Sequence, residues 1–523
     1  MEPGLPVWVR HDDGRLAPFD ADAISQALFA ASESLAEPNA FLARELADGS
    51  LHFLAREGLG ETASTTQIAE VVEKVVRELG QPRLARAFVE RATRTTTPKT
   101  SDRPTLVLPF SPTDKPADLI HRCLEAFSLR AIYSPDLAAA HEEGLLRIGG
   151  LDHPDLLSAV SLEAAVLGPG DSQETAWNMV ADGASRSGEN LILDGAEWLV
   201  PKAKLDGIRK AIAGLSPDVK SRSLRIWKHL HGSAAPAWAR QIPEGPLFPG
   251  ATPTPLGSSS LWLEYAGPGS DMKRTVWHWH GSIEENAGFL DWFLPSWGAV
   301  MFDRTRQPTS LGMGMCRRHP AVLLEVGVQL PALLGRPEID GRGDVFLEKL
   351  PSLSRMAVSA GVQKRRFLRG RSEQASRGFL LDRAVVRVVP IGLESVVRRL
   401  LGTRLTDSKL SLDLGRKILT ALNQPLADEQ RTTGLNLVLG GPPEPISWRG
   451  PDALKTFHAL GELQRGLCDG FIHAILEAEP STDRQRERAE WGAFFDALHQ
   501  KSNVTGIVWT PVTVAARQGE FFA

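Results

Sequence analysis

The first hundred residues carry the clearest pattern of apolar and polar positions in the chain. Val7 and Val9 alternate about Trp8, and the sequence then turns at Asp13-Gly14. Period-two alternation closed by Asp-Gly is typical of a β-hairpin, because glycine accepts the positive φ of a tight turn. The spacing then becomes helical, and four helices are predicted. Their apolar positions are Ile24, Ala27, Leu28, Ala31 and Leu35; Phe41, Leu42, Leu46, Phe53 and Leu54; Ile68, Val71, Val72, Val75, Val76 and Leu79; and a fourth set within residues 83–94.

Two local signals fix where the last two helices begin. Ser64-Thr-Thr-Gln67 is a capping-box pattern, in which the serine and glutamine side chains bond each other's backbone N–H groups. Gly80-Gln-Pro82 then separates the third helix from the fourth. A hairpin followed by four short helices is a small α+β module, which we place at residues 6–95.

This module resembles an ATP-cone, the nucleotide-sensing domain at the N-terminus of many ribonucleotide reductases. The resemblance implies ATP or dATP as an allosteric ligand, with no metal. The segments that carry it are Val9-Arg-His-Asp-Asp-Gly14, Phe19-Asp20, Ile24, Ser64-Thr-Thr-Gln-Ile68, Arg77-Glu-Leu-Gly80 and Leu84-Ala-Arg-Ala-Phe88.

Carried over residue by residue, the resemblance implies a nucleotide site in this module. The family usually has a Lys-Arg pair just before the Asp-Gly turn, where this chain has His11 and Asp12, and a lysine where this chain has Ala23. Two hypotheses therefore stay open: a cone that binds nucleotide, and a folded cone that has lost its affinity. The implied site residues are Val9, Arg10, His11, Asp20, Thr65, Thr66, Ile68, Arg91 and Arg94.

Length and composition add further expectations. A chain of 523 residues suggests about three or four domains, although large barrels are exceptions. The net charge of −4 gives no reason to expect nucleic acid as a partner. No signal peptide or membrane-spanning apolar run is visible, and three cysteines are too few for a disulfide framework or a four-cysteine zinc site. We therefore expect a cytoplasmic protein that binds neither nucleic acid nor membranes.

After the module, residues 96–116 are polar and proline-punctuated and predict a linker. A helix ending at Gly144 and a short buried strand follow. From here on the chain resembles anaerobic, glycyl-radical ribonucleoside-triphosphate reductases, with several partial matches in the family's order. The resemblance implies an α/β fold, a ten-stranded α/β barrel over residues 117–523. The matching segments are His141 to Asp152, Gly312-Met-Gly-Met-Cys-Arg-Arg318, Val326-Gly-Val-Gln-Leu-Pro-Ala-Leu333, Phe346 to Leu368, Val389-Pro-Ile-Gly-Leu-Glu394 and Leu437-Val-Leu-Gly-Gly-Pro-Pro-Glu444.

The resemblance also says which residues would do the chemistry. Cys316 takes the position of the finger-loop cysteine that becomes a thiyl radical, although a free cysteine is also a common core residue. The family's two Cys-x-x-Cys pairs are absent, and Gly519 is the one weak counterpart of its radical glycine. Gln329 and Ala332 replace a family asparagine and arginine. The scaffold is thus expected to be inherited and the radical machinery lost.

Three other features can be interpreted without a family. His278 and His280 would share one face of a strand, which suits a metal, but no well-spaced third ligand follows, so an aromatic core or pocket rim is favoured. The basic run from Lys364 to Arg371 predicts a solvated helix face. Cys123 and Cys468 are expected to be packing residues.

Two functions are left to decide between. The first is a nucleotide-responsive, catalytically silent relative of the reductases that acts as a regulator, as a homodimer or with a reductase partner chain. The second is an active ribonucleoside-triphosphate reductase with Cys316 as the thiyl site and a radical supplied by another chain.

Overall fold

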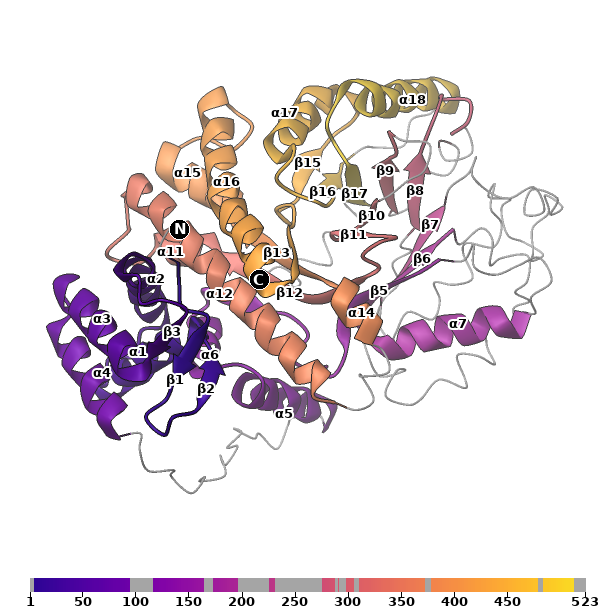
Figure 1. The fold of residues 1–523 in the computed structure, drawn as a ribbon. Coiled ribbons are helices and arrows are strands. Elements are labelled where there is room, and N and C mark those ends of the chain that lie inside the picture. Colours follow the sequence, from indigo (N-terminus) through magenta and orange to yellow (C-terminus); the bar gives the residue numbers. More distant parts are fainter. Residues whose placement is uncertain are drawn as a thin grey trace.

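The computed structural model describes residues 4–94, 116–163, 173–195, 225–230, 275–286, 290, 298–304, 310–371, 378–477 and 483–511. These residues form an N-terminal α+β module and a larger α/β body (Figure 1). The predicted α/β class is confirmed. Within the described ranges, no helix is long and apolar enough to cross a membrane.

The N-terminal module contains the predicted hairpin and all four predicted helices. Gly14 turns the hairpin with φ of 83°, and Ser64 and Gln67 form the predicted capping box. A third strand, β3, was not predicted, because no local turn joins it to its distant partner β1. The elements are β1 (Trp8–Arg10), β2 (Leu16–Pro18), α1 (Asp22–Ser34), α2 (Ala40–Glu57), β3 (Thr62–Ser64), α3 (Thr65–Glu78) and α4 (Pro82–Arg94).

The body is built on one large mixed sheet. Its strands follow the order β14-β13-β12-β5-β6-β7-β8-β9-β17-β16-β15, with β4 also paired to β12. Strands β5 to β9 run parallel to one another, and the β12–β5 and β17–β9 pairs are antiparallel. The strands are β4 (Leu146–Ile148), β5 (Leu157–Glu163), β6 (Ser187–Asp194), β7 (Arg225–Leu230), β8 (Thr275–Trp279), β9 (Gly298–Phe302), β12 (Ala321–Gln329), β13 (Val385–Ile391), β14 (Asn436–Leu439), β15 (Ile446–Trp448), β16 (Ile472–Leu476) and β17 (Gly506–Pro511).

This sheet is rolled, so that strands far apart along it face each other across an interior. Trp227 of β7 and Phe471, next to β16, stack with ring centroids 6.5 Å apart and planes 5° apart. The two ends of the roll meet where Gly440, after β14, bridges Asp469, before β16. The described ladder stays open at this seam apart from that one bridge. The closed ten-stranded barrel therefore stays a prediction.

A short hairpin lies inside the roll. Strands β10 (Ser310–Gly312) and β11 (Met315–Cys316) pair with each other and with no other described strand. Leu311 and Met315 pack with residues of β5, β6, β12 and β13 in one buried cluster. Gly314 lies so close to β14 that an added Cβ would be 3.1 Å from the Val438 side chain. Among the described residues, the hairpin is therefore packed against the strands that surround it.

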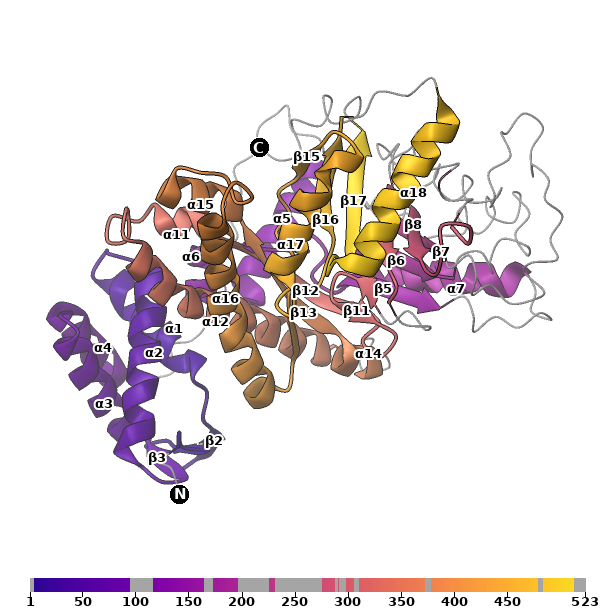
Figure 2. The ribbon, with the colours of Figure 1, turned by 90° about the horizontal axis from the view of Figure 1, so that it is seen from above.

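Helices cover the outside of the sheet, and one of them also contacts the N-terminal module. α12 packs on β12 and α16 on one side and on α2 of the N-terminal module on the other (Figures 1 and 2). Gly361 allows the close contact with the sheet, since a Cβ there would be 2.7 Å from Val386. The body helices are α5 (Pro116–Ala131), α6 (Pro135–Glu142), α7 (Gln173–Arg186), α11 (Leu330–Leu334), α12 (Gly343–Arg369), α14 (Gly378–Arg383), α15 (Leu393–Leu401), α16 (Lys409–Thr433), α17 (Leu454–Gln464) and α18 (Arg484–Lys501), with the 3-10 turn η7 (Pro451–Ala453).

One sequence expectation can be compared directly with this packing. The solvated face predicted for the basic run is wrong at Lys364, which is 2% exposed and donates to the Pro154 carbonyl oxygen at 2.5 Å. Burial, only partly offset by nearby carboxylates, lowers the pKa of Lys364 to about 8.

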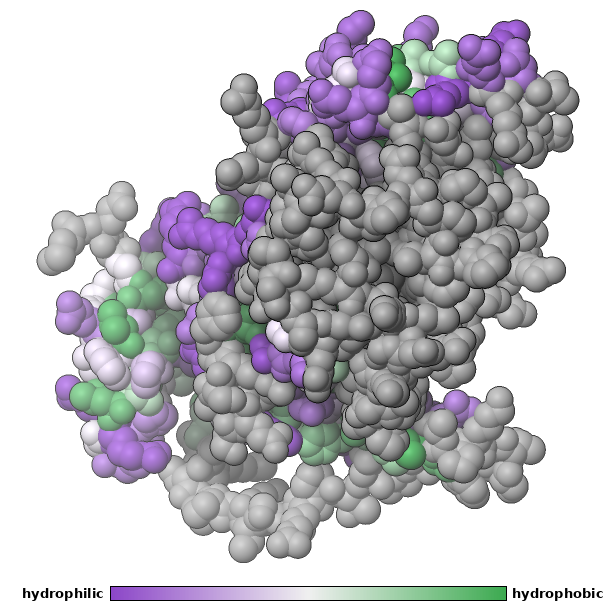
Figure 3. Space-filling model, turned by 90° about the vertical axis from the view of Figure 1, so that its right-hand side faces the viewer, coloured by the Kyte–Doolittle hydropathy of each residue, from purple (hydrophilic) through white to green (hydrophobic). Residues whose placement is uncertain are grey.

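The described residues at the top of the molecule are mostly hydrophilic on the face drawn in Figure 3.

Candidate functional site

Backbone pairing brings the predicted nucleotide residues of the hairpin next to the start of α3. β1 pairs in parallel with β3, which places Arg10 beside Ser64, one residue before Thr65. The Arg10 side chain is exposed, and Thr66 is exposed on the first turn of α3. Ser64 and Gln67 satisfy each other's backbone N–H groups at 2.9 and 3.1 Å. The N-terminus of a helix attracts anions, so this junction is a suitable place for phosphate.

Asp12 occupies the same junction. Its carboxylate accepts a hydrogen bond of 3.0 Å from the Thr65 hydroxyl, which joins the hairpin turn to the first residue of α3. A carboxylate near a helix N-terminus is itself a favourable anion, because the helix dipole is positive there. Asp12 therefore stands where a phosphate would compete with it. The sequence identified Asp12 as a departure from the family, but the bond to Thr65 could not be predicted from it.

Asp20, one of the implied nucleotide residues, lies between β2 and α1. One of its carboxylate oxygens accepts from the backbone N–H of Asp22 at 3.1 Å. The other is 3.6 Å from the Arg366 guanidinium of α12. Asp20 thus lies where the N-terminal module meets the body, and sequence reasoning did not anticipate this partner.

The remaining predicted residues are placed less tightly. Val9 is the middle residue of β1, and Ile68 is half-buried against the core of the module. His11 closes the hairpin through its backbone, accepting from the Gly14 N–H and donating to the Arg15 carbonyl, both at 2.8 Å. Arg91 and Arg94 lie on the last turn of α4. Their contact with a nucleotide stays a prediction.

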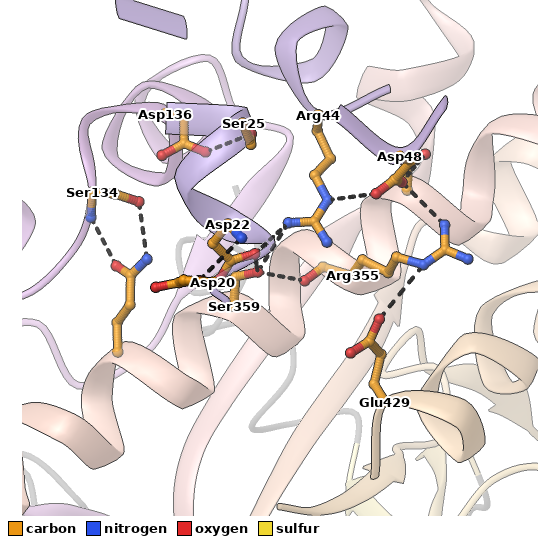
Figure 4. A network of polar contacts seen from close by, with 12 residues as sticks. Asp20, Asp22, Ser25, Arg44, Asp48, Ser134, Asp136, Arg355, Ser359 and Glu429 are labelled. Atoms are coloured by element: carbon orange, nitrogen blue, oxygen red, sulfur yellow. Dashed lines mark hydrogen bonds and ion pairs between the residues drawn. The ribbon is translucent and has the colours of Figure 1, made fainter. Parts of the chain in front are cut away.

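A buried ionic network joins the N-terminal module to the body (Figure 4). Arg44 of α2, with 7% of its side chain exposed, contacts Asp22 at 2.8 Å and Asp48 at 3.1 Å. It also donates to the Ser359 hydroxyl of α12 at 3.1 Å. Burial by itself would lower the pKa of Arg44, but Asp48 and Asp22 outweigh it and raise that pKa. Arg44 is therefore held as a cation between two elements of the module and one of the body.

The same network continues through Asp48 toward α16. Asp48 accepts from the Ser352 hydroxyl at 2.8 Å and from the Arg355 guanidinium at 3.0 Å, both on α12. Arg355 in turn lies 3.7 Å from Glu429 of α16. Asp22 accepts from the Ser359 hydroxyl at 2.8 Å. Four helices thus share one network of charged and hydroxyl side chains, which we call the joint: Asp22, Arg44, Asp48, Ser352, Arg355, Ser359 and Glu429.

Apolar packing and further polar contacts extend the joint on both sides. Buried residues of the N-terminal module and of the body belong to one continuous hydrophobic cluster. Glu45 pairs with Lys349 at 2.7 Å, and the Ser25 hydroxyl donates to Asp136 at 2.9 Å. Arg336 donates to Asn39 at 3.2 Å, the residue that caps α2. The N-terminal module is therefore packed directly on the body.

The candidate thiol lies on the interior hairpin, near its base. The tip is Gly312-Met313-Gly314, with φ of 78°, 56° and 75°. Cys316 pairs with Ser310 and exchanges backbone hydrogen bonds with His319 at 2.9 and 3.1 Å. Its thiol is half-buried. Gly519, the predicted counterpart of the radical glycine, lies outside the described residues.

The other cysteines and histidines that the sequence indicated are also placed. Cys123 lies on α5 and is half-buried. Cys468 packs against the core, and burial raises the pKa of its thiol to about 12. His278 is buried on β8, whereas His280 follows the strand. In the part of the chain that the structure describes, no group of three or more His, Cys, Asp or Glu side chains could hold a metal ion.

Comparison with known proteins agrees with this picture of the N-terminal module. Residues 8–94 match the family model described as "ATP cone domain". The N-terminal module is therefore an ATP-cone domain, and we refer to it as the cone. No curated protein matches the chain.

Solved structures similar to this chain are anaerobic ribonucleotide reductases. One, described as "Anaerobic ribonucleotide reductase", is 10% identical, with 75% of this chain and 79% of that chain covered and a TM-score of 0.47. Another is the anaerobic ribonucleotide reductase from Thermotoga maritima in complex with dATP and CTP, with 10% identity, 75% and 82% covered, and a TM-score of 0.46. The same enzyme with citrate in the active site gives 11%, 89% and 98%, and a TM-score of 0.48.

Proposed function

We propose that the chain is a nucleotide-responsive regulator, in which the cone binds ATP or dATP and the body passes on the result. The observation that carries this proposal is the β1–β3 pairing, which sets Arg10 beside the start of α3 in a module that matches the ATP-cone family. Arg10, Thr65 and Thr66 would contact the phosphates, with Val9, His11, Asp20, Ile68, Arg91 and Arg94 completing the site. No metal is part of the proposal.

The cone's position supports a role in regulation. Asp20, an expected nucleotide residue, is 3.6 Å from Arg366, and its neighbour Asp22 belongs to the joint. A ligand that reorganises the start of α1 would therefore act on α12, the helix that packs on the sheet. For the domains we propose the cone at 6–95, a linker at 96–116 and a reductase-like barrel domain at 117–523.

Calorimetry with ATP and dATP on the full-length chain tests the binding step. We expect saturable binding that is lost in the Arg10→Ala/Thr65→Ala double variant. Arg15→Ala is the matched control, because Arg15 lies on the same hairpin but pairs with Asp13 at 2.9 Å. No binding at millimolar nucleotide would contradict the proposal and leave the cone with a structural role alone.

We propose that the body performs no reductase chemistry of its own. The chain's three cysteines cannot form the two Cys-x-x-Cys pairs of the reductases that it resembles. A partner reductase chain or a second copy of this chain would then receive the signal. Purified protein that reduces a ribonucleoside triphosphate without a partner would refute this part.

The second candidate function is a reductase that receives its radical from another chain. The observation that favours it is the place of Cys316 on a hairpin inside the rolled sheet, beside a strained tip of three residues with positive φ. Cys316→Ser should then abolish ribonucleotide reduction by the assembled complex while leaving the unfolding curve unchanged. Full activity in that variant would exclude Cys316 as the thiyl site.

A further inference from the structure

The seam of the roll has much less backbone pairing than the rest of the sheet. Each neighbouring pair of described strands shares two or more paired residues, and β16 and β17 share five. At the seam, the described residues form one bridge, between Gly440 and Asp469, in which the Asp469 N–H donates to the Leu439 carbonyl oxygen at 2.9 Å. Local opening costs least where few hydrogen bonds have to break, so the seam is the place at which the roll can open.

On the inner side of the seam, Arg387 of β13 holds its two edges together. The Arg387 side chain is 10% exposed and pairs with Glu325 of β12. A Cβ added at Gly440 would be 2.8 Å from three atoms of the guanidinium, and one added at Gly470 would be 3.3 Å from Nη2. Glycine at both positions thus lets the two edges close over the charge. Burial raises the pKa of Asp469, and the positive charge of Arg387 opposes that rise.

On the outer side, Arg416 of α16 holds the segment that leads into the seam. Its guanidinium donates to the carbonyl oxygens of Glu462, Leu463 and Arg465, at 2.6, 3.1 and 3.1 Å. These carbonyls end α17, where a cation is favourable because the helix dipole is negative there. The chain then reaches Cys468, which directly precedes the bridged residue of the seam. Arg416 therefore fixes the approach to the seam from outside.

The tip of the interior hairpin lies against both edges of the seam. A Cβ added at Gly312 would be 2.8 Å from the ring of Phe471, which directly precedes β16, and one added at Gly314 would be 3.1 Å from Val438 of β14. Met313, between these glycines, has φ of 56°. A side chain in this strained conformation persists only where the surrounding structure holds it. Separation of the two edges would therefore release the tip.

One helix connects the seam to the cone. Arg416 lies toward the N-terminal end of α16, and Glu429 of the joint lies toward its C-terminal end. Between them, α16 continues through the buried Pro425 and packs on α12, where the Ser354 hydroxyl donates to the Leu422 carbonyl oxygen at 3.0 Å (Figures 1 and 2). The 25 residues of α16 span roughly 38 Å at about 1.5 Å per residue. A displacement of this helix at the joint therefore reaches the seam.

We propose that the seam is a gate over the hairpin tip, with Arg387 and Arg416 as its latches and α16 as its link to the cone. The structure is that of the closed gate, in which both latches are formed. Opening breaks the single bridge, exposes Cys468 and frees the tip. A movement of the cone at the joint shifts this equilibrium through α16.

This inference extends the proposed function by naming the part of the body that responds to the cone. The link to nucleotide rests on the proposed function, whereas the gate itself does not. A cone without nucleotide affinity would leave the gate to be tested by substitutions at the joint. Equally, a seam that stays closed would leave nucleotide binding by the cone intact, so the two failures are distinguishable.

The thiol of Cys468 reports the opening. Burial raises its pKa to about 12, and the thiolate is the form that attacks a disulfide reagent, so the closed gate suppresses labelling. The experiment uses the full-length chain carrying Cys123→Ser and Cys316→Ser. Release of thionitrobenzoate from dithiobis-nitrobenzoate then follows Cys468 alone. A urea unfolding curve of each variant gives the contribution of the globally unfolded chain, which is subtracted.

Three substitutions in this background test the latch and the link. Arg416→Met should raise the labelling rate about tenfold, because one lost hydrogen bond to a charged group shifts an opening equilibrium by at least that factor. Arg355→Met, which detaches Glu429 from the joint, should raise it by a smaller factor. Arg431→Met is the matched control on α16 and should label like the parent, because Arg431 and Asp428 are 78% and 67% exposed.

Two outcomes for the variants would overturn the proposal. Equal labelling rates in Arg416→Met and Arg431→Met would show that α16 does not latch the seam. A raised rate in Arg416→Met with an unchanged rate in Arg355→Met would show that the joint is not connected to it. Hydrogen exchange of the wild type needs no variant to fold: the Asp469 N–H must exchange faster than the amides of the β16–β17 ladder, and equal protection would also refute the gate.

Discussion

The joint and the nucleotide junction of the cone are both built from charged side chains, but they use them differently. At the joint, Arg44 is buried, with 7% of its side chain exposed, and it is bonded by Asp22, Asp48 and Ser359. At the junction, Asp12, Arg10 and Thr66 are exposed, and Asp12 accepts a hydrogen bond from the Thr65 hydroxyl. Buried charges are costly to leave unpaired, whereas exposed pairs are worth little. The joint therefore fixes the position of the cone on the body. The side chains of the junction can exchange partners at a small cost in free energy.

Removing Arg44 should have the largest effect on stability. Arg44→Met leaves Asp22 and Asp48 without their shared cation, and breaking a buried pair in this way costs about 3–5 kcal/mol. Urea unfolding measures the loss. Arg83→Ala is the control, because Arg83 and Glu37 are 71% and 64% exposed at 3.1 Å and should contribute less than about 1 kcal/mol. Equal losses in the two variants would refute the contrast between the joint and the exposed surface.

Lys364 of α12 is a buried cation that bonds a backbone carbonyl, and the free-energy cost of burying its charge appears in its pKa. Its folded-state pKa of about 8 lies below its usual 10.5, so the unfolded chain binds the proton more tightly. The free energy of unfolding should therefore rise as pH increases from 8 to 10.5, by roughly 3 kcal/mol in all, at about 1.4 kcal/mol per unit. Unfolding of wild type and Lys364→Met across this range checks the sign. The variant should lack the rise, and an identical rise in both would remove Lys364 as its cause.

The sequence predicted the cone well because its signals are local. The hairpin turn at Gly14 and the capping box of Ser64 and Gln67 each lie within a few residues, and both are confirmed. β3 was missed because its partner β1 is far away in sequence and no hairpin turn joins the two strands.

The joint could not be predicted from sequence, because it depends on distant pairs. Arg44 meets Ser359 across 315 positions. The sequence indicated His278 through its spacing with His280, but His229 is the imidazole that it contacts. Lys364 looked solvated because its neighbours in the run are charged, although the run spans more than one face of α12.

At the junction, Asp12 should limit nucleotide affinity. Asp12→Asn removes the negative charge beside Thr65 while keeping a hydrogen-bond acceptor. If the cone binds ATP as proposed, the dissociation constant should fall about tenfold, equivalent to about 1.4 kcal/mol of relieved repulsion. Calorimetry measures the change. Asp13→Asn is the control, since Asp13 pairs with Arg15, and weaker binding in Asp12→Asn would mean that Asp12 assists the ligand.

The smallest effect should come from the contact that links the two regions. Asp20 and Arg366 are 46% and 71% exposed and 3.6 Å apart, so Arg366→Gln should change the free energy of unfolding by less than about 1 kcal/mol. Its effect on nucleotide binding is the informative quantity. If the pair must open when nucleotide binds, removing Arg366 should tighten ATP binding by a few-fold, and this gain should shrink as salt rises.

Lys349→Gln, which breaks a pair with Glu45 elsewhere along the same helix, should leave ATP affinity unchanged. If Arg366→Gln binds ATP no more tightly than Lys349→Gln, the exposed Asp20–Arg366 pair does not respond to nucleotide. Any signal from cone to body would then have to pass through the buried charges of the joint.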